Sequence, residues 1–204
     1  YYFKYFIDRP PNPFEKASIK RENSQIEGSD LCLAFVSATA EYMNNKYSTP
    51  VLYLGNAINS IYTPDKEEIM KVNEEFKNIL FIGSMKYIQS ARDLIEAFKI
   101  VKNTISNAKL HIVGLLTDDF EDLPEGVFCH GYLDKAIKQE QDLYYELMKT
   151  AKVFVNSSPK WASFSSSLEA MYFYTPVLVP PYQGFLEIFG SDFKGGHFYD
   201  ENFS

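Results

Sequence analysis

Residues 78–114 read NILFIGSMKYIQSARDLIEAFKIVKNTISNAKLHIVG, and this stretch decides the fold. Its two ends, residues 78–84 and 109–114, are short apolar runs typical of buried parallel strands. The segment between them, residues 91–104, has the periodicity of an amphipathic helix. The apolar residues on one face of that helix are Leu94, Ile95, Phe98 and Val101. The sequence therefore predicts a strand, a crossover helix and a parallel strand.

The same alternation continues on both sides of this unit. We expect further strands at residues 31–37, 51–56, 127–132, 152–158 and 176–181. Helices are expected at residues 38–47, 140–151 and 165–174. Residues 1–30 lack clean periodicity and contain RPPNP, so we interpret them as irregular. Apolar strands that alternate with helices predict a doubly wound, Rossmann-like α/β domain with right-handed crossovers. Such a parallel sheet binds ligands beyond the carboxyl ends of its strands.

Composition narrows the classes of function. The 204 residues include 20 basic and 27 acidic side chains, and the net charge of −7 argues against a nucleic-acid-binding surface. No apolar run is long enough to span a membrane, and no secretory leader pattern opens the chain. Cys32 and Cys129 have no cysteine or histidine at metal-ligand spacing, so both are interpreted as reduced and structural. No metal site is expected.

The first candidate ligand site is the strand exit FIGSMKYIQ. Gly83 would let a ligand approach the backbone, and Ser84, Lys86 and Gln89 would offer donors over the strand end. The dinucleotide fingerprint needs three glycines, and no phosphate loop of the Walker type occurs, so a nicotinamide or flavin site is not expected. A tight strand-to-helix turn without a ligand explains the same residues.

The second candidate is residues 155–171, VNSSPKWASFSSSLEAM. A helix that begins near Phe164 or Ser165 would present free backbone amides that suit a pyrophosphate. Neighbouring hydroxyls could add donors, namely Ser163, Ser165, Ser166 and Ser167. Glu169 could accept two hydrogen bonds from a diol such as a ribose. Spacing alone also permits an N-cap serine with Glu169 as an ordinary acid near the helix start, and it leaves both interpretations open.

The histidines suggest no catalytic constellation. His111 lies inside a predicted strand and is interpreted as a packed residue, whereas His130 at a strand end could line a ligand cleft. His197 lies in a glycine-rich segment. No serine or cysteine nucleophile can be matched to these histidines by spacing.

The order of several strings adds information that no single string carries. FIGSMKYIQSARDLIEAFKIV, KLHIVG, VFCHGYL, DLYYELMKTAKVFVNSS and SFSSSLEAMYFYTPVLV resemble successive blocks of the group 1, family-four-like glycosyltransferases. The blocks belong to the C-terminal, donor-binding domain of the GT-B fold. SDLCLAFVSATAEYMNNKY resembles the last strand and helix of that family's N-terminal domain, and PVLYLGNAINSIYTP resembles its interdomain link. The resemblance covers about residues 29–190.

The resemblance implies roles for particular residues. Glu169 matches the acid that binds the ribose hydroxyls, whereas Trp161 stands where the family has the acid that contacts the transferred sugar. Ser84 and Gln89 stand where the family commonly has an arginine and a lysine that bind the diphosphate; Lys86 could supply one charge. The nucleotide base would pack at Gly131 and Tyr132. Three further positions complete the match: Gly184 and Glu187 correspond to GGxPEI, and Tyr174 replaces a glycine.

The resemblance also implies a function and a domain organisation. Residues 1–50 would be a remnant of the N-terminal acceptor domain, and residues 51–204 a truncated donor domain. The expected activity is retaining transfer from a nucleotide-diphosphate sugar to a glycan, lipid-carrier or other acceptor, without a required metal or other cofactor. We expect a cytoplasmic protein, at the inner face of the membrane if the missing N-terminal half associates with it, and an inactive chain when isolated. The alternative is a degenerate module that binds a nucleotide or a protein partner without catalysis; a dehydrogenase is disfavoured by the missing glycines.

Overall fold

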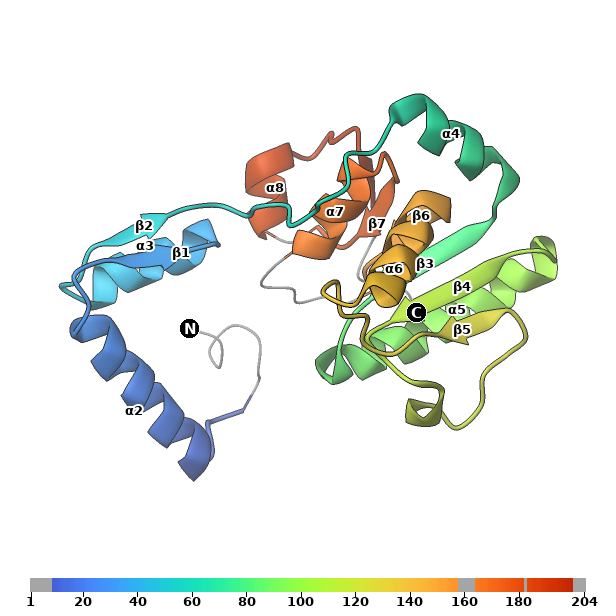
Figure 1. The fold of residues 1–204 in the computed structure, drawn as a ribbon. Coiled ribbons are helices and arrows are strands. Elements are labelled where there is room, and N and C mark those ends of the chain that lie inside the picture. Colours follow the sequence, from blue (N-terminus) through green and yellow to red (C-terminus); the bar gives the residue numbers. More distant parts are fainter. Residues whose placement is uncertain (1–8, 158–163, 182, 200–204) are drawn as a thin grey trace. The chain divides into compact units, whose positions relative to one another are not determined.

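The computed structural model describes residues 9–157, 164–181 and 183–199 (Figure 1). These residues form two compact units. The larger unit contains residues 58–157, 165–181 and 189–199. The smaller unit contains residues 9–57, Phe164 and residues 183–188.

The larger unit is built on a parallel sheet of six strands. The strands are β3 (Asn78–Ile82), β4 (Lys109–Val113), β5 (Val127–Cys129), β6 (Ala151–Val155), β7 (Val177–Val179) and β8 (Gly196–Phe198). Their order is β5-β4-β3-β6-β7-β8, and every pairing is parallel. β4 and β5 are added on one side of β3, and β6, β7 and β8 are added on the other side. The strand order therefore reverses between β3 and β6. The predicted doubly wound α/β fold is confirmed.

Helices cover the sheet because its strands are apolar on both faces. On one face, α5 (Ile88–Thr104) follows a short 3-10 turn, η1 (Met85–Tyr87), and contributes Leu94, Ile95 and Phe98 to a core that includes Phe81 and Leu110. The helices α4 (Lys66–Glu75), α6 (Lys138–Thr150) and α7 (Ser165–Tyr172) also belong to this unit. Contacts place α6 against β3 and α4 against β6 (Figure 1). A second 3-10 turn, η2 (Thr117–Asp119), lies between β4 and β5.

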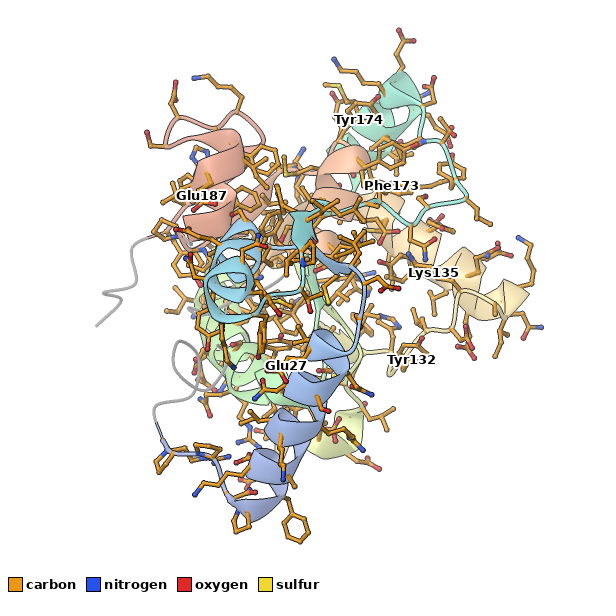
Figure 2. The ribbon with its side chains drawn as sticks, turned by 90° about the vertical axis from the view of Figure 1, so that its left-hand side faces the viewer. Glu27, Tyr132, Lys135, Phe173, Tyr174 and Glu187 are labelled. Carbon is orange, nitrogen blue, oxygen red and sulfur yellow. The ribbon has the colours of Figure 1, made fainter. Side chains whose placement is uncertain are left out.

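The C-terminal end of α7 closes in a Schellman motif, which sets the direction of the chain toward β7. The Thr175 amide donates to Ala170 O at 3.0 Å, and the Tyr174 amide donates to Met171 O at 2.9 Å. Tyr174 takes the left-handed residue of this motif, with φ of 56°. Tyr174, which replaces the family glycine, thus takes a backbone conformation that favours glycine (Figure 2).

The smaller unit contains α2 (Pro13–Glu27), β1 (Cys32–Ala34), α3 (Ser37–Lys46) and β2 (Val51–Tyr53). The two strands pair in parallel, and Ala34 and Val51 pack against Ala40 of α3. Several apolar side chains on these strands and directly beside them are exposed: Leu31, Leu33, Phe35, Leu52, Tyr53 and Leu54. Most of α8 (Gln183–Phe189) also clusters with this unit. The predicted boundary at residue 50 falls inside the unit, because β2 pairs with β1.

The interpretation of residues 1–30 as irregular is wrong for α2. Asn12 and Glu15 form a reciprocal capping box: Asn12 Oδ1 accepts from the Glu15 amide at 2.9 Å, and Glu15 Oε2 accepts from the Asn12 amide at 2.7 Å. Pro13 occupies the first turn, where its missing N–H costs nothing. No residue of this helix is buried, so its sequence carries no apolar periodicity. The sequence pattern also failed to indicate α4, α8 and β8.

Candidate functional site

Three glycines bring neighbouring strand ends together at the carboxyl edge of the sheet. The Gly83 amide donates to Val113 O at 3.0 Å, and the Gly114 amide donates to Gly131 O at 2.6 Å. Gly114 and Gly131 both have positive φ, at 94° and 67°. This edge carries the predicted residues Gly83 and Tyr132, and the Tyr132 side chain is 80% exposed (Figure 2). One exposed aromatic ring therefore lies at this edge, whereas Gly131 is buried and Gly83 and Gly114 are half-buried.

The predicted diphosphate donors follow β3 directly. Ser84 precedes η1 and Lys86 lies within it, and both side chains are exposed. Gln89 is turned along its own helix, because its Nε2 donates to Asp93 Oδ1 at 2.9 Å. Ser84 and Lys86 are therefore accessible at the edge of the sheet, whereas the Gln89 side chain is hydrogen-bonded to Asp93.

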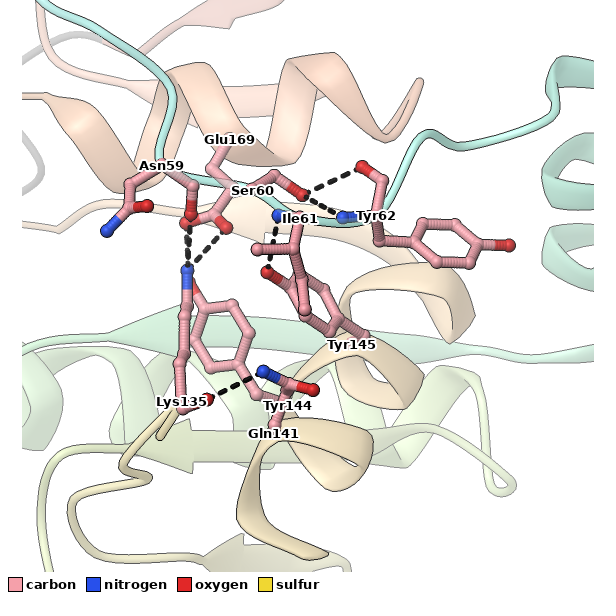
Figure 3. A network of polar contacts seen from close by, with 9 residues as sticks. All are labelled: Asn59, Ser60, Ile61, Tyr62, Lys135, Gln141, Tyr144, Tyr145 and Glu169. Carbon is pink, nitrogen blue, oxygen red and sulfur yellow. Dashed lines mark hydrogen bonds and ion pairs between the residues drawn. The ribbon is translucent and has the colours of Figure 1, made fainter. Parts of the chain in front are cut away.

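Glu169 lies one turn into α7 and is only 7% exposed. Its Oε1 accepts a hydrogen bond from Lys135 Nζ at 2.6 Å, and its Oε2 accepts one from the Tyr144 hydroxyl at 2.7 Å (Figure 3). Both partners come from outside the helix. Glu169 is therefore part of a buried polar network and is not a cap of its own helix.

Lys135 reaches this network from the loop after β5. Its Nζ also donates to Asn59 O at 3.2 Å and lies 4.1 Å from the centre of the Tyr144 ring. The backbone of the loop is fixed as well, because Gln141 Nε2 donates to Lys135 O at 2.6 Å (Figure 3). The ammonium is thus held by a carboxylate, a carbonyl and an aromatic face, and it balances the charge of Glu169.

Tyr144 supplies the second donor from the buried side of α6. Burial, followed by the charge of Glu169, raises the pKa of its hydroxyl far above the ordinary value. The phenol therefore keeps its proton and acts as the donor toward Oε2. The adjacent Tyr145 is equally buried, but its hydroxyl accepts a hydrogen bond from the Ile61 amide at 3.2 Å.

The serines at the start of α7 differ in exposure. Ser165 is exposed and Ser166 is half-buried, so both are accessible from solvent. Ser167 is fully buried, and its hydroxyl has no partner among the described residues. Phe164 is also buried, and its ring centre lies 5.1 Å from that of Phe185. Phe164 is a further predicted donor-binding residue at the start of this helix, and that role stays a prediction. Trp161 and Ser163 lie outside the described residues.

Sequence reasoning missed Lys135 and Tyr144. Lys135 does lie just beyond a strand end, which was the signal available in GYLDK. Nothing local distinguishes Tyr144 from its neighbour Tyr145, because only the packing of α6 decides which hydroxyl meets Glu169. The structure thus adds two residues to the predicted site.

His111, on β4, and His130, directly after β5, form a pair. Their rings stack at 5.2 Å, and His111 Nδ1 lies 3.0 Å from His130 Nε2. Burial, His130 and Lys109 lower the pKa of His111 to about 4, and burial lowers that of His130. The described residues contain no group of three or more His, Cys, Asp or Glu side chains suited to a metal ion.

The family of the chain follows from a comparison with family models. Residues 63–203, more than half of the chain, match the model described as glycosyl transferases group 1. The chain belongs to this family. The resemblance inferred from the ordered strings is confirmed, and Glu169, Lys135 and Tyr144 lie inside the matched region. A comparison with curated proteins finds no match.

Several solved structures share the fold of this chain. WaaG, described as involved in lipopolysaccharide biosynthesis, matches with a TM-score of 0.69 and 20% identity, over 95% of this chain and 56% of that one. A mutant of S. aureus TarM, in complex with Fondaparinux, alpha-GlcNAc-glycerol and UDP, matches with a TM-score of 0.66 and 20% identity. The match covers 95% of this chain and 39% of that one. Sucrose-phosphate synthase from Thermosynechococcus elongatus matches with a TM-score of 0.61 and 17% identity, over 90% of this chain and 48% of that one.

These likenesses establish the fold. The chain spans 36% to 56% of the length of TarM and WaaG. Among its described residues, no helix combines the length and the apolar character needed to cross a membrane.

Proposed function

We propose that this chain binds a nucleotide-diphosphate sugar at the carboxyl edge of its six-stranded sheet, as the donor-binding part of a retaining glycosyltransferase. The observation that carries the proposal is the state of Glu169. Its carboxylate is nearly buried, one turn inside α7, and within the described part of the chain each oxygen accepts one hydrogen bond from a side chain. A carboxylate offers about four acceptor positions, so two are left for a vicinal diol such as a ribose.

The other donor-site residues would each contact a different part of the nucleotide sugar. The N-terminal amides of α7, with the hydroxyls of Ser165 and Ser166, suit the diphosphate. Ser84 and Lys86 at the end of β3 would add one hydroxyl and one positive charge. The base would pack on the backbone at Gly131 beside the Tyr132 ring. Trp161, where the family has its sugar-contacting acid, would lie near the transferred sugar.

Transfer in such a site depends on positioning and leaving-group stabilisation. The bond between the anomeric carbon and the diphosphate oxygen breaks, and the electron pair leaves with the diphosphate. The acceptor hydroxyl forms the new bond on the same face of the sugar and gives its proton to the departing diphosphate oxygen. Helix amides and Lys86 would stabilise the charge on the leaving group, so the proposal requires no metal ion.

The acceptor is proposed to be a glycan or a lipid-linked saccharide. In support, TarM was solved with alpha-GlcNAc-glycerol and UDP, and WaaG is described as acting in lipopolysaccharide biosynthesis. A chain with such an acceptor would work in the cytoplasm, at the inner face of the membrane. The residues that select the acceptor would belong to a further domain.

A second candidate function is nucleotide or partner binding without transfer. The observation that favours it is Gln89, which stands where the family has a diphosphate-binding lysine and is engaged by Asp93. Ser84 and Trp161 depart from the family pattern as well. With one exposed lysine in place of two fixed cations, the leaving group would be less stabilised.

Isothermal titration calorimetry with UDP, GDP, ADP and their hexose conjugates tests both candidates. Binding of one nucleoside diphosphate, with its sugar conjugate bound at least as well, supports a donor site. Binding of the diphosphate together with rejection of every sugar conjugate favours the module without transfer. If no compound binds at millimolar concentration, the donor-site proposal is wrong.

A further inference from the structure

Glu169 is held at two points by groups from different elements. Lys135 comes from the loop after β5, and Tyr144 comes from the middle of α6. The loop is itself tied to α6, because Gln141 Nε2 donates to Lys135 O and the Asp134 amide donates to Glu140 Oε2 at 2.7 Å. The two donors are therefore fixed relative to each other, and the carboxylate between them has one preferred orientation (Figure 3).

A glutamate side chain has several rotatable bonds, and ordering them on ligand binding costs conformational entropy. A carboxylate that is already fixed has lost this freedom before the ligand arrives, which is the general advantage of preorganisation. The Tyr144 hydroxyl is suited to this task because burial and the charge of Glu169 keep it protonated. Glu169 is its only hydrogen-bonding partner among the described residues.

We propose that Tyr144 is a positioning residue for Glu169, and that together with Lys135 it fixes the carboxylate for recognition of a ribose diol. The inference rests on the proposed donor site. Tyr144 touches no ligand in this proposal, and it acts through the orientation of Glu169. Its effect is therefore confined to ligands whose hydroxyls bind that carboxylate.

The chain offers a matched control for this role. Tyr145 is adjacent to Tyr144, lies on the same helix, and has the same exposure of 7%. Its hydroxyl meets the Ile61 amide and not Glu169. Tyr144→Phe and Tyr145→Phe each remove one buried hydroxyl from α6 and preserve the ring. Only the first removes a donor from the carboxylate.

The experiment measures binding of UDP, GDP and ADP, and of their 2′,3′-dideoxy counterparts, to the 204-residue chain and its variants. We expect Tyr144→Phe to weaken binding of the preferred ribonucleotide about tenfold, the effect of losing a hydrogen bond to a charged group. It should leave the dideoxy compound unchanged. Tyr145→Phe should leave the ratio of the two affinities as in the wild type. Against a Glu169→Ala background, Tyr144→Phe should have no further effect.

An equal loss for both compounds, or no loss for either, would overturn the positioning role and leave the donor site standing. Failure of the wild type to bind any nucleoside diphosphate would overturn both. If Tyr144→Phe does not fold, Lys135→Met provides an independent test, because it removes the other donor and keeps the aliphatic stem over the Tyr144 ring. The same ribose-specific loss is expected, and a loss shared by the dideoxy compound would contradict the proposal.

Discussion

The carbonyl oxygen of Gly83 occupies the space that a side chain on Gly114 would need. A Cβ atom built on Gly114 lies 1.8 Å from that oxygen, and the φ of Gly114 is 94°. The two glycines thus let the ends of β3 and β4 approach at the edge where we place the donor site. This contact leads to the first prediction.

Gly114→Ala should be strongly destabilising. The methyl group meets rigid backbone, and alanine disfavours this φ, so we expect a loss of more than about 3 kcal/mol in the free energy of unfolding. Urea denaturation measures it. Gly190→Ala is the control: it also has positive φ, but nothing lies within 4 Å of the added Cβ, so it should cost only about 1 kcal/mol.

Tyr174→Gly should stabilise the chain. Tyr174 holds the left-handed position of the Schellman motif after α7, where glycine has no steric penalty. The expected gain is about 1 kcal/mol, observed as a rise in the thermal midpoint. Tyr174→Ala removes the same ring but keeps the penalty. A gain of equal size with alanine would show that the ring, and not the backbone, is the source of strain.

Glu169→Gln should weaken nucleotide binding. The substitution keeps the shape of the side chain, but it removes the charge and replaces one acceptor oxygen by a donor. The expected loss is about 1–3 kcal/mol for a ribonucleoside diphosphate. Glu96→Gln serves as the control, because Glu96 forms an ion pair with Lys99 on the exposed side of α5. Unchanged affinity in Glu169→Gln would mean that this carboxylate has only a structural role.

Ser167→Ala should not destabilise the chain, although Ser167 is fully buried. Its hydroxyl has no partner among the described residues, so alanine removes a desolvated polar group and leaves almost the same volume. We expect a stability equal to the wild type or higher by about 1 kcal/mol. A clear loss of stability would reveal a partner for this hydroxyl, and calorimetry with nucleotide would show whether that partner is the ligand.

Stability should fall as the pH is lowered from 6.5 to 4. The pKa of His111 is about 4 in the folded chain against an ordinary 6.5, because of burial, His130 and Lys109. In this window the unfolded chain takes up a proton that the folded chain does not, so this contribution is complete above pH 6.5. His111→Phe should flatten the dependence of urea midpoints on pH.

The strands β3, β4, β5, β6 and β7 of the large sheet could be predicted because each is a continuous apolar run in the sequence. β8 could not, because its residues Gly196–Phe198 form no such run. The helix α2 could not be found by periodicity, since it buries no residue. Its start was nevertheless encoded in NPFE, where Asn12 and Glu15 form the capping box around Pro13. Pro10 and Pro11, directly before this capping box, instead favour an irregular segment in the sequence pattern.

The site was predictable in part. The position of Glu169 after a strand and one turn into a helix follows from the local sequence. Its partners Lys135 and Tyr144 do not, because they are 34 and 25 residues away and meet it only after α6 packs on the sheet. The predicted boundary at residue 50 falls inside the smaller compact unit for a related reason. The sequence 51–56 indicates a strand, but it does not say which strand will pair with it.

The sheet of β1 and β2 has a practical consequence for every measurement above. Its two strands leave apolar side chains such as Leu33 and Leu52 in solvent, together with unpaired strand edges among the described residues. Surfaces of this kind promote self-association and precipitation. Replacing Leu33 and Leu52 by lysine would add charge to the smaller unit without touching the residues of the donor site. Such a variant is the suitable background for calorimetry at high protein concentration.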